Sequence, residues 1–123
     1  LMPTIHIFIL LLLKHTFADL FLQSTRPPAN KSSILSYGLH RHCIDHGILT
    51  LIILLFFVNF KLAIMLAILD YCSHCLIDFT KHKIMTHYGI PKQGQKFWAL
   101  QTADQALHYI TYFIIVMLIG VNI

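Results

Sequence analysis

The stretch LAIMLAILDYCSHCLIDFTKH, residues 62–82, changes character halfway along its length. Every residue before Asp70 is apolar, as in a helix that lies in lipid, and from there an acid or an imidazole recurs at every fourth position. These residues are Asp70, His74, Asp78 and His82. Because side chains four residues apart stack on one face of an α-helix, the stretch predicts a membrane helix with a polar stripe in its second half.

The composition of the whole chain is that of an integral membrane protein. Its 123 residues are 57% hydrophobic, with a mean hydropathy of +0.70, and only 11% are charged. A soluble domain carries about 25% charged residues. The acidic residues are all Asp, which excludes the Glu-dependent HExxH motif of zinc peptidases, and the three Cys form no disulfide framework. The nine His are a large excess, and they favour metal or proton chemistry.

Breaks in the apolar pattern divide the chain into four expected spans, over residues 4–23, 34–60, 61–83 and 97–121. The first break contains Pro27 and Pro28, which cannot continue a helix. The last break is the polar stretch THYGIPKQGQK, residues 86–96. Spans of this length cross a hydrocarbon core of about 30 Å at about 1.5 Å per residue. We therefore expect an all-α, up-down-up-down, four-helix membrane bundle that forms a single domain over residues 1–123, with no soluble domain.

Each expected span has one polar half, and in an up-down-up-down bundle these halves meet in one leaflet. Eight of the nine Lys and Arg lie in the polar halves or in the two loops that join them, and Lys61 is the exception. The positive-inside rule then predicts that the polar end and the loops 24–33 and 84–96 are cytoplasmic and that both termini lie outside. The net charge of +4 is read as this topology signal, with membrane lipids as partners and no nucleic acid.

Within its polar half, each span carries two potential metal ligands spaced four residues apart. The pairs are His15 and Asp19, His42 and His46, His74 and Asp78, and Asp104 and His108. Each pair projects from one helix face, so all four pairs can converge in the bundle core. Imidazole together with carboxylate suits Zn²⁺, Mn²⁺ or Fe²⁺, and the pattern predicts a site for one or two such divalent ions.

Two alternatives to a metal site stay open. Pairing of Asp with His across helices would contribute about 0.6 kcal/mol per contact, whereas each charged residue costs at least about 2.5 kcal/mol to insert. The chain would then be a non-enzymatic membrane subunit. A proton or metal-ion carrier would need a polar path to the outer surface, and the apolar runs ILTLIILLFFV (48–58) and YITYFIIVMLIG (109–120) offer none.

Five short motifs along the chain resemble one family. They are KHTFADLFLQ (14–23), NKSS (30–33), HCIDHGILT (42–50), SHCLIDFTKH (73–82) and ADQALHY (103–109). In this order they resemble the small bacterial integral-membrane proteins grouped as domain of unknown function 3307. The resemblance implies a four-helix protein of the bacterial inner membrane. It also implies a shared set of polar residues, which consists of the four His/Asp pairs given above together with Gln23, Lys81 and Gln105.

A looser similarity is to membrane-bound metal-dependent hydrolases that carry an HxxxH motif. It implies hydrolysis of a lipid or phosphoester, in which a metal activates water and a free carboxylate acts as base. Asp70 and Asp45 are the candidates for the base, and Lys81 is expected to meet a phosphate at the cytoplasmic rim. Cys72 and Cys75, although spaced as CxxC, are expected to be small apolar fillers. Tyr109, Tyr112 and Phe113 have the spacing of packing aromatics.

Overall fold

The computed structural model describes residues 2–25 and 36–122, with side chains from Thr4 onward in the first range. The described residues form helices and no strand. The N-terminal rod consists of α1 (Met2–Thr16), the π-helix η1 (Phe17–Leu22) and the short α2 (Gln23–Thr25). Three further helices follow: α3 (Tyr37–Leu55), α4 (Phe60–Tyr88) and α5 (Gln95–Asn122). The all-α prediction is confirmed.

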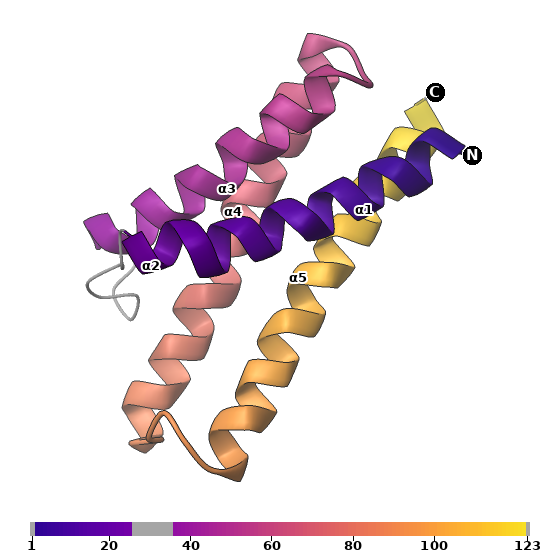
Figure 1. Cartoon of the computed structure of the whole chain (residues 1–123). Coiled ribbons are helices and arrows are strands. Elements are labelled where there is room, and N and C mark those ends of the chain that lie inside the picture. Colours follow the sequence, from indigo (N-terminus) through magenta and orange to yellow (C-terminus); the bar gives the residue numbers. More distant parts are fainter. Residues whose placement is uncertain (1, 26–35, 123) are drawn as a thin grey trace.

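The helices pack in a closed cycle. α1 contacts both α3 and α5, and α4 also contacts both α3 and α5. The N- and C-terminal ends of the chain lie beside each other at one end of the molecule, where α1 runs along α5 (Figure 1). Every helix therefore has two neighbours across the interior.

Two of the predicted helix boundaries are wrong by about a turn or more. α4 does not stop at residue 83 but continues to Tyr88, so residues 84–88 of the predicted loop 84–96 are helical. The end is set by Gly89, whose φ of +61° closes the helix through a hydrogen bond from Ile90 N to Met85 O. Polar composition before this glycine does not by itself end a helix.

The predicted span 34–60 is also too long, because α3 ends at Leu55. The turn after it leads to Asn59, whose side chain accepts a hydrogen bond from Leu62 N at 2.9 Å and caps the start of α4. At the other end Ser36 caps α3. Residues 34–35, and residues 26–33 of the predicted loop 24–33, lie outside the described part of the chain.

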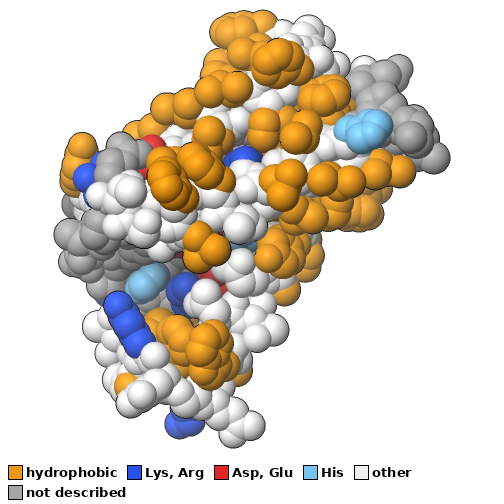
Figure 2. All heavy atoms as spheres, in the orientation of Figure 1, with side chains coloured by type: hydrophobic (Ala, Val, Ile, Leu, Met, Phe, Trp, Pro, Cys, Tyr) orange, Lys and Arg blue, Asp and Glu red, His pale blue; other side chains and the backbone are white. Residues whose placement is uncertain are grey.

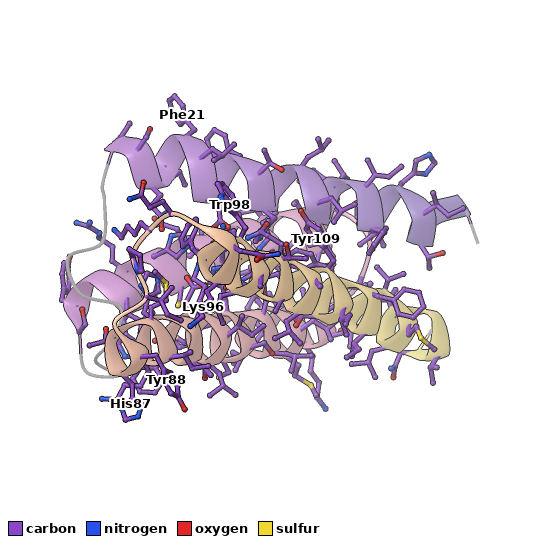
Figure 3. All side chains as sticks on the ribbon, turned by 90° about the horizontal axis from the view of Figure 1, so that it is seen from below. Phe21, His87, Tyr88, Lys96, Trp98 and Tyr109 are labelled. Carbon is purple, nitrogen blue, oxygen red and sulfur yellow. The ribbon has the colours of Figure 1, made fainter. Side chains whose placement is uncertain are left out.

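The interior has an apolar and a polar section. The apolar core lies toward the chain termini and consists of Ile7, Leu11, Leu54, Ala63, Leu66, Tyr112, Ile115 and Ile119. Buried Lys, His, Thr and Asp side chains fill the other section. Many large apolar side chains, such as Leu13, Ile68 and Ile110, are exposed on the outside of the helices. In Figure 3 the labelled Phe21 points away from the other helices. A polar interior beneath an apolar surface suits lipid surroundings.

Among the described residues, three helices are long and apolar enough to cross a membrane: Thr4–Thr25, Phe60–Tyr88 and Gln95–Asn122. α3 is shorter, with 19 residues, and its first half is rich in ionisable side chains. Of the four predicted spans, length and hydropathy thus support three.

Candidate metal centre

All eight predicted ligands face the polar section of the interior. Seven of them are at most 4% exposed, and the side chain of Asp19 is 21% exposed. Each of the four long helical segments contributes one pair at the predicted spacing of four residues, and the structure brings the four pairs together in this section.

Asp19 is the centre of the first group of ligands. Its Oδ1 lies 2.8 Å from Nε2 of His46, 3.1 Å from Nε2 of His42 and 3.9 Å from Nε2 of His74. Its Oδ2 lies 3.0 Å from Nε2 of His15. Both oxygens of one carboxylate are therefore surrounded by imidazole nitrogens from three helical segments.

Asp78 holds a similar position on the opposite side of the cluster. Its Oδ2 lies 3.5 Å from Nε2 of His74 and 3.6 Å from Nε2 of His42, and its Oδ1 lies 3.2 Å from Nε2 of His108. The same His108 nitrogen lies 3.5 Å from Oδ1 of Asp104. The carboxylates and imidazoles thus alternate through the interior.

Three overlapping sets of these residues have ligand atoms within 4.8 Å of one another, close enough to hold a metal ion. The sets are Asp19 with His42, His46 and His74; His15 with His74 and His108; and Asp78 with Asp104 and His108. Within the described residues, Nδ1 of His74 and Oδ1 of Asp104 are buried without a hydrogen-bond partner. Buried polar atoms rarely lack a hydrogen-bond partner, so these two atoms are available to bind another molecule or ion.

The imidazoles themselves are crowded. The His74 ring stacks between His46 and His108, with ring centroids 3.6 Å and 4.0 Å apart. The Nε2 atoms of His42 and His74 lie 3.2 Å apart, so at most one of them can donate a hydrogen to the other. The Nε2 atoms of His42 and His74 therefore cannot both carry a hydrogen that is directed at the other ring.

The π-helix η1 presents Asp19 to this cluster. Its six residues, Phe17–Leu22, replace the regular α-helical turn at the point where the N-terminal rod passes the other ligands. Ala18 is fully buried beside Asp19, and the amide of Gln23 donates to the Asp19 carbonyl oxygen at 3.2 Å. π-helical turns often occur at functional sites, and nothing in the local sequence signalled this one.

Lys14 is a member of the site that the sequence reasoning missed, because it was read only as a topology charge. Its Nζ is buried and donates to Oδ2 of Asp70 at 2.7 Å and to the His46 carbonyl oxygen at 3.4 Å. It is also hydrogen-bonded to Nδ1 of His46 at 3.0 Å. The Thr50 hydroxyl donates to Asp70 as well. The His46 ring is thus held at both of its nitrogens, by Lys14 at Nδ1 and by Asp19 at Nε2.

Tyr112 was predicted to be a packing residue, and it also has a polar role. Its ring is fully buried in the apolar core, and its hydroxyl lies 2.8 Å from Nδ1 of His15. The spacing held a signal, since Tyr112 follows His108 by four residues and shares its face. Gln105, in the family-like set, lies 3.1 Å from Nε2 of His15 and donates to Asp104 at 2.9 Å.

The three candidate catalytic residues lie in different surroundings. Asp70 is bound by Lys14 and Thr50, and Lys14 links it to Nδ1 of His46. Lys81 lies at the rim, 3.0 Å from Oε1 of Gln101 and 3.6 Å from Oδ2 of Asp104. Asp45 is half-buried on α3 and belongs to none of the three sets. Lys81 is therefore the candidate in direct contact with a ligand.

The cysteines lie outside the cluster. Cys75 is buried with Cys43 in a small apolar contact with Leu39, as expected of a filler, but the same expectation is wrong for Cys72, which is exposed because it lies on the outer face of α4.

The fold and the site together define a helical protein with membrane-type helices and a buried His/Asp cluster. The chain belongs to the family described as protein of unknown function (DUF3307), whose model matches residues 7–123. The family resemblance seen in the sequence motifs is confirmed. No curated protein and no solved structure matches the chain. The similarity to metal-dependent hydrolases therefore rests on the sequence motif alone.

Proposed function

We propose that this chain is an integral membrane protein that binds divalent transition-metal ions in its buried His/Asp cluster. The observation that carries this proposal is the convergence of imidazole Nε2 atoms on the carboxylates of Asp19 and Asp78, at 2.8 to 3.9 Å. Ligands held about 2.0–2.1 Å from a tetrahedral ion lie about 3.3 Å from one another. The spacing of the cluster thus suits an ion at its centre.

Purely structural pairing fits these contacts less well. Three imidazole nitrogens share Oδ1 of Asp19, and two of them, on His42 and His74, also face each other. Only one hydrogen can lie between the facing Nε2 atoms of His42 and His74, and a partly satisfied buried network is costly. A cation accepts all of these lone pairs at once and neutralises the carboxylates.

A carrier that crosses the membrane is opposed by the apolar core. Ile7, Leu11, Leu54, Ile115 and Ile119 are all 0% exposed and fill the interior between the cluster and the chain termini. A proton or hydrated ion would have to pass through this packed layer. Binding in the polar section of the interior is therefore favoured over transport.

We further propose that α3 is a fourth span and that the cluster faces the cytoplasm of a bacterial cell. The 19 residues of α3 reach about 28 Å, close to the thickness of a bilayer core. Its two ligands, His42 and His46, are buried rather than turned to lipid, and Leu54 enters the apolar core. The positive-inside rule supplies the orientation.

Hydrolysis of a lipid ester or phosphoester at the cytoplasmic leaflet is the reaction that we propose for the centre. It is supported by access, because Asp19 is the one ligand with appreciable exposure and Lys81 lies at the rim near Asp104. His, Lys or Arg, and acidic side chains appear together in a hollow of the surface (Figure 2). A bound ion would polarise the ester oxygen and activate water. Release of phosphate or fatty acid from vesicles by the metal-loaded protein, but not by the His46→Ala variant, tests this.

Elemental analysis of the purified protein tests metal binding itself. We expect stoichiometric Zn, Mn or Fe in the wild type after purification without chelators, and loss of the metal in the double variant His46→Ala, Asp78→Ala. The double variant His6→Ala, His87→Ala is the matched control, because both imidazoles are exposed and lie outside the cluster. Metal-free wild-type protein would refute the proposal, as would equal metal content in all three proteins.

A further inference from the structure

We infer that the cluster is a two-ion centre in which Asp19 and Asp78 each bridge the two ions. The inference rests on the proposed metal binding and goes beyond it, since one buried ion would satisfy that proposal equally well. It depends on how the two oxygens of each carboxylate are divided between different imidazoles.

The oxygens of Asp19 face different ligands. Oδ1 lies within 3.1 Å of Nε2 atoms from His42 and His46, both on α3, whereas Oδ2 lies 3.0 Å from Nε2 of His15, on α1. A carboxylate that served a single ion would direct one or both oxygens to the same point. Here the two oxygens point toward two separate groups of nitrogen.

Asp78 is divided in the same way. Its Oδ2 faces His42 and His74, at 3.6 Å and 3.5 Å, and its Oδ1 faces His108 at 3.2 Å. The nitrogens near Oδ2 of Asp78 belong to the same group as those near Oδ1 of Asp19. His108, near the other oxygen, is grouped with His15 by ligand distance.

Two ligand sets follow from this division. The first ion would be held by His42 and His46 with Oδ1 of Asp19 and Oδ2 of Asp78. The second would be held by His15, His108 and Asp104 with the remaining oxygen of each bridging carboxylate. His74 stacks between His46 of the first set and His108 of the second, and its ring lies between the two proposed ion positions.

The number of ligands also favours two ions. Zn²⁺ takes about four ligands and Mn²⁺ about six, so a single ion would leave two to four of the eight clustered groups without a metal partner. The orphan Oδ1 of Asp104 lies on the side of the second set, 3.5 Å from Nε2 of His108. Two-ion centres have their ions about 3.5–4 Å apart, a separation that one carboxylate can bridge, and they clamp the oxygens of phosphoesters.

Manganese loading of the purified full-length protein tests this inference. We expect two Mn²⁺ per chain and an exchange-coupled electron paramagnetic resonance spectrum, because carboxylate bridges couple the two spins. The single variants His42→Ala and Asp104→Asn, one from each ligand set, should each bind one Mn²⁺ and show the spectrum of an isolated ion.

The wild-type measurement decides the matter even if a variant fails to fold. One uncoupled ion per chain would overturn the two-ion centre and leave metal binding intact, and two uncoupled ions would overturn the bridging carboxylates. No bound manganese, together with no metal in the protein as purified, would overturn both proposals. A folded single variant that kept or lost both ions would contradict the division of ligands.

Discussion

At the scale of single residues, the His/Asp cluster depends on side chains that hold its members in place as well as on those members. Lys14 and Asp70 form a buried ion pair, with side chains 4% and 2% exposed, and Lys14 also lies 4.8 Å from the centre of the Tyr112 ring. A buried charge that loses its partner is strongly destabilising, whereas a pair removed as a whole costs far less. Such a pair can be tested by a double-mutant cycle.

The variant Lys14→Met should lose about 3–5 kcal/mol of stability, because it leaves the buried Asp70 carboxylate without its cationic partner. The double variant Lys14→Met, Asp70→Asn should recover a large part of that loss, since Thr50 can still donate to the amide oxygen. Unfolding in mixed detergent and sodium dodecyl sulfate micelles would measure both. Strictly additive losses would show that the two charges do not interact.

Tyr112→Phe removes one hydroxyl and keeps the packed ring. We expect metal affinity to fall by about 10- to 100-fold, because the hydroxyl orients His15 through Nδ1 and groups that hold a ligand usually have effects of this size. Competition with a chelating dye would measure the affinity. Tyr109→Phe is the control, since this tyrosine is 42% exposed and its hydroxyl donates to Gln105, at 3.4 Å, rather than to an imidazole. Unchanged affinity in Tyr112→Phe would contradict the orienting role.

The sequence allowed the convergence of the His and Asp pairs to be predicted more completely than the contacts that support them. His15, His42, His74 and Asp104 begin regular four-residue pairs within apolar helices, and helical geometry alone brings the members of each pair together. The contact between Lys14 and Asp70 joins α1 to α4, and it depends on how each helix is rotated about its axis. That rotation is set by packing, and the one-dimensional pattern does not contain it.

At the scale of helices, the distance between α3 and α4 sets how closely the His side chains of the two helices approach each other. Gly47, next to His46, lies against α4: a Cβ placed there would come within 3.4 Å of Tyr71 Cβ and 3.5 Å of the Ala67 carbonyl oxygen. An alanine just fits, and a larger side chain would push the helices apart. The glycine therefore helps to hold His46 and His74 in contact.

Gly47→Leu should cost about 1–3 kcal/mol and lower the metal content, because overpacking separates α3 from α4. Elemental analysis and detergent unfolding would test both effects. Gly120→Leu is the matched control on α5, where a Cβ would meet nothing within 4 Å. If Gly47→Leu bound metal as the wild type does, close packing of α3 on α4 would not be needed for the site.

The helix ends and the π-helix mark the limit of prediction at this scale. The polar residues after Lys83 suggested a loop, but they continue α4 until Gly89, which can adopt the positive φ of a helix end. The sequence of η1, FADLFL, has no motif that predicts a π-helix, because its wider turn depends on packing against the neighbouring helices. Neither the end of α4 nor the π-helix η1 can be predicted from the pattern of apolar and polar residues alone.

At the scale of the whole molecule, the proposed orientation can be tested by labelling. Phe56 and Lys92 lie in the turns at opposite ends of α4, and both are exposed. With Cys43, Cys72 and Cys75 replaced by Ala, we expect a membrane-impermeant thiol reagent to label Phe56→Cys in intact cells stripped of their outer membrane. Lys92→Cys should react only after the membrane is permeabilised. The reverse pattern would invert the topology, and labelling of both without permeabilisation would contradict a spanning α4.

The central claim is that metal ions bind between Asp19 and Asp78. Anomalous X-ray diffraction from crystals of the protein, purified without chelators and measured on either side of the metal absorption edge, tests this claim most directly. The account predicts strong difference peaks within bonding distance of these two carboxylates and of the imidazoles that face them. Occupied peaks elsewhere, or none in a well-ordered crystal, would contradict it.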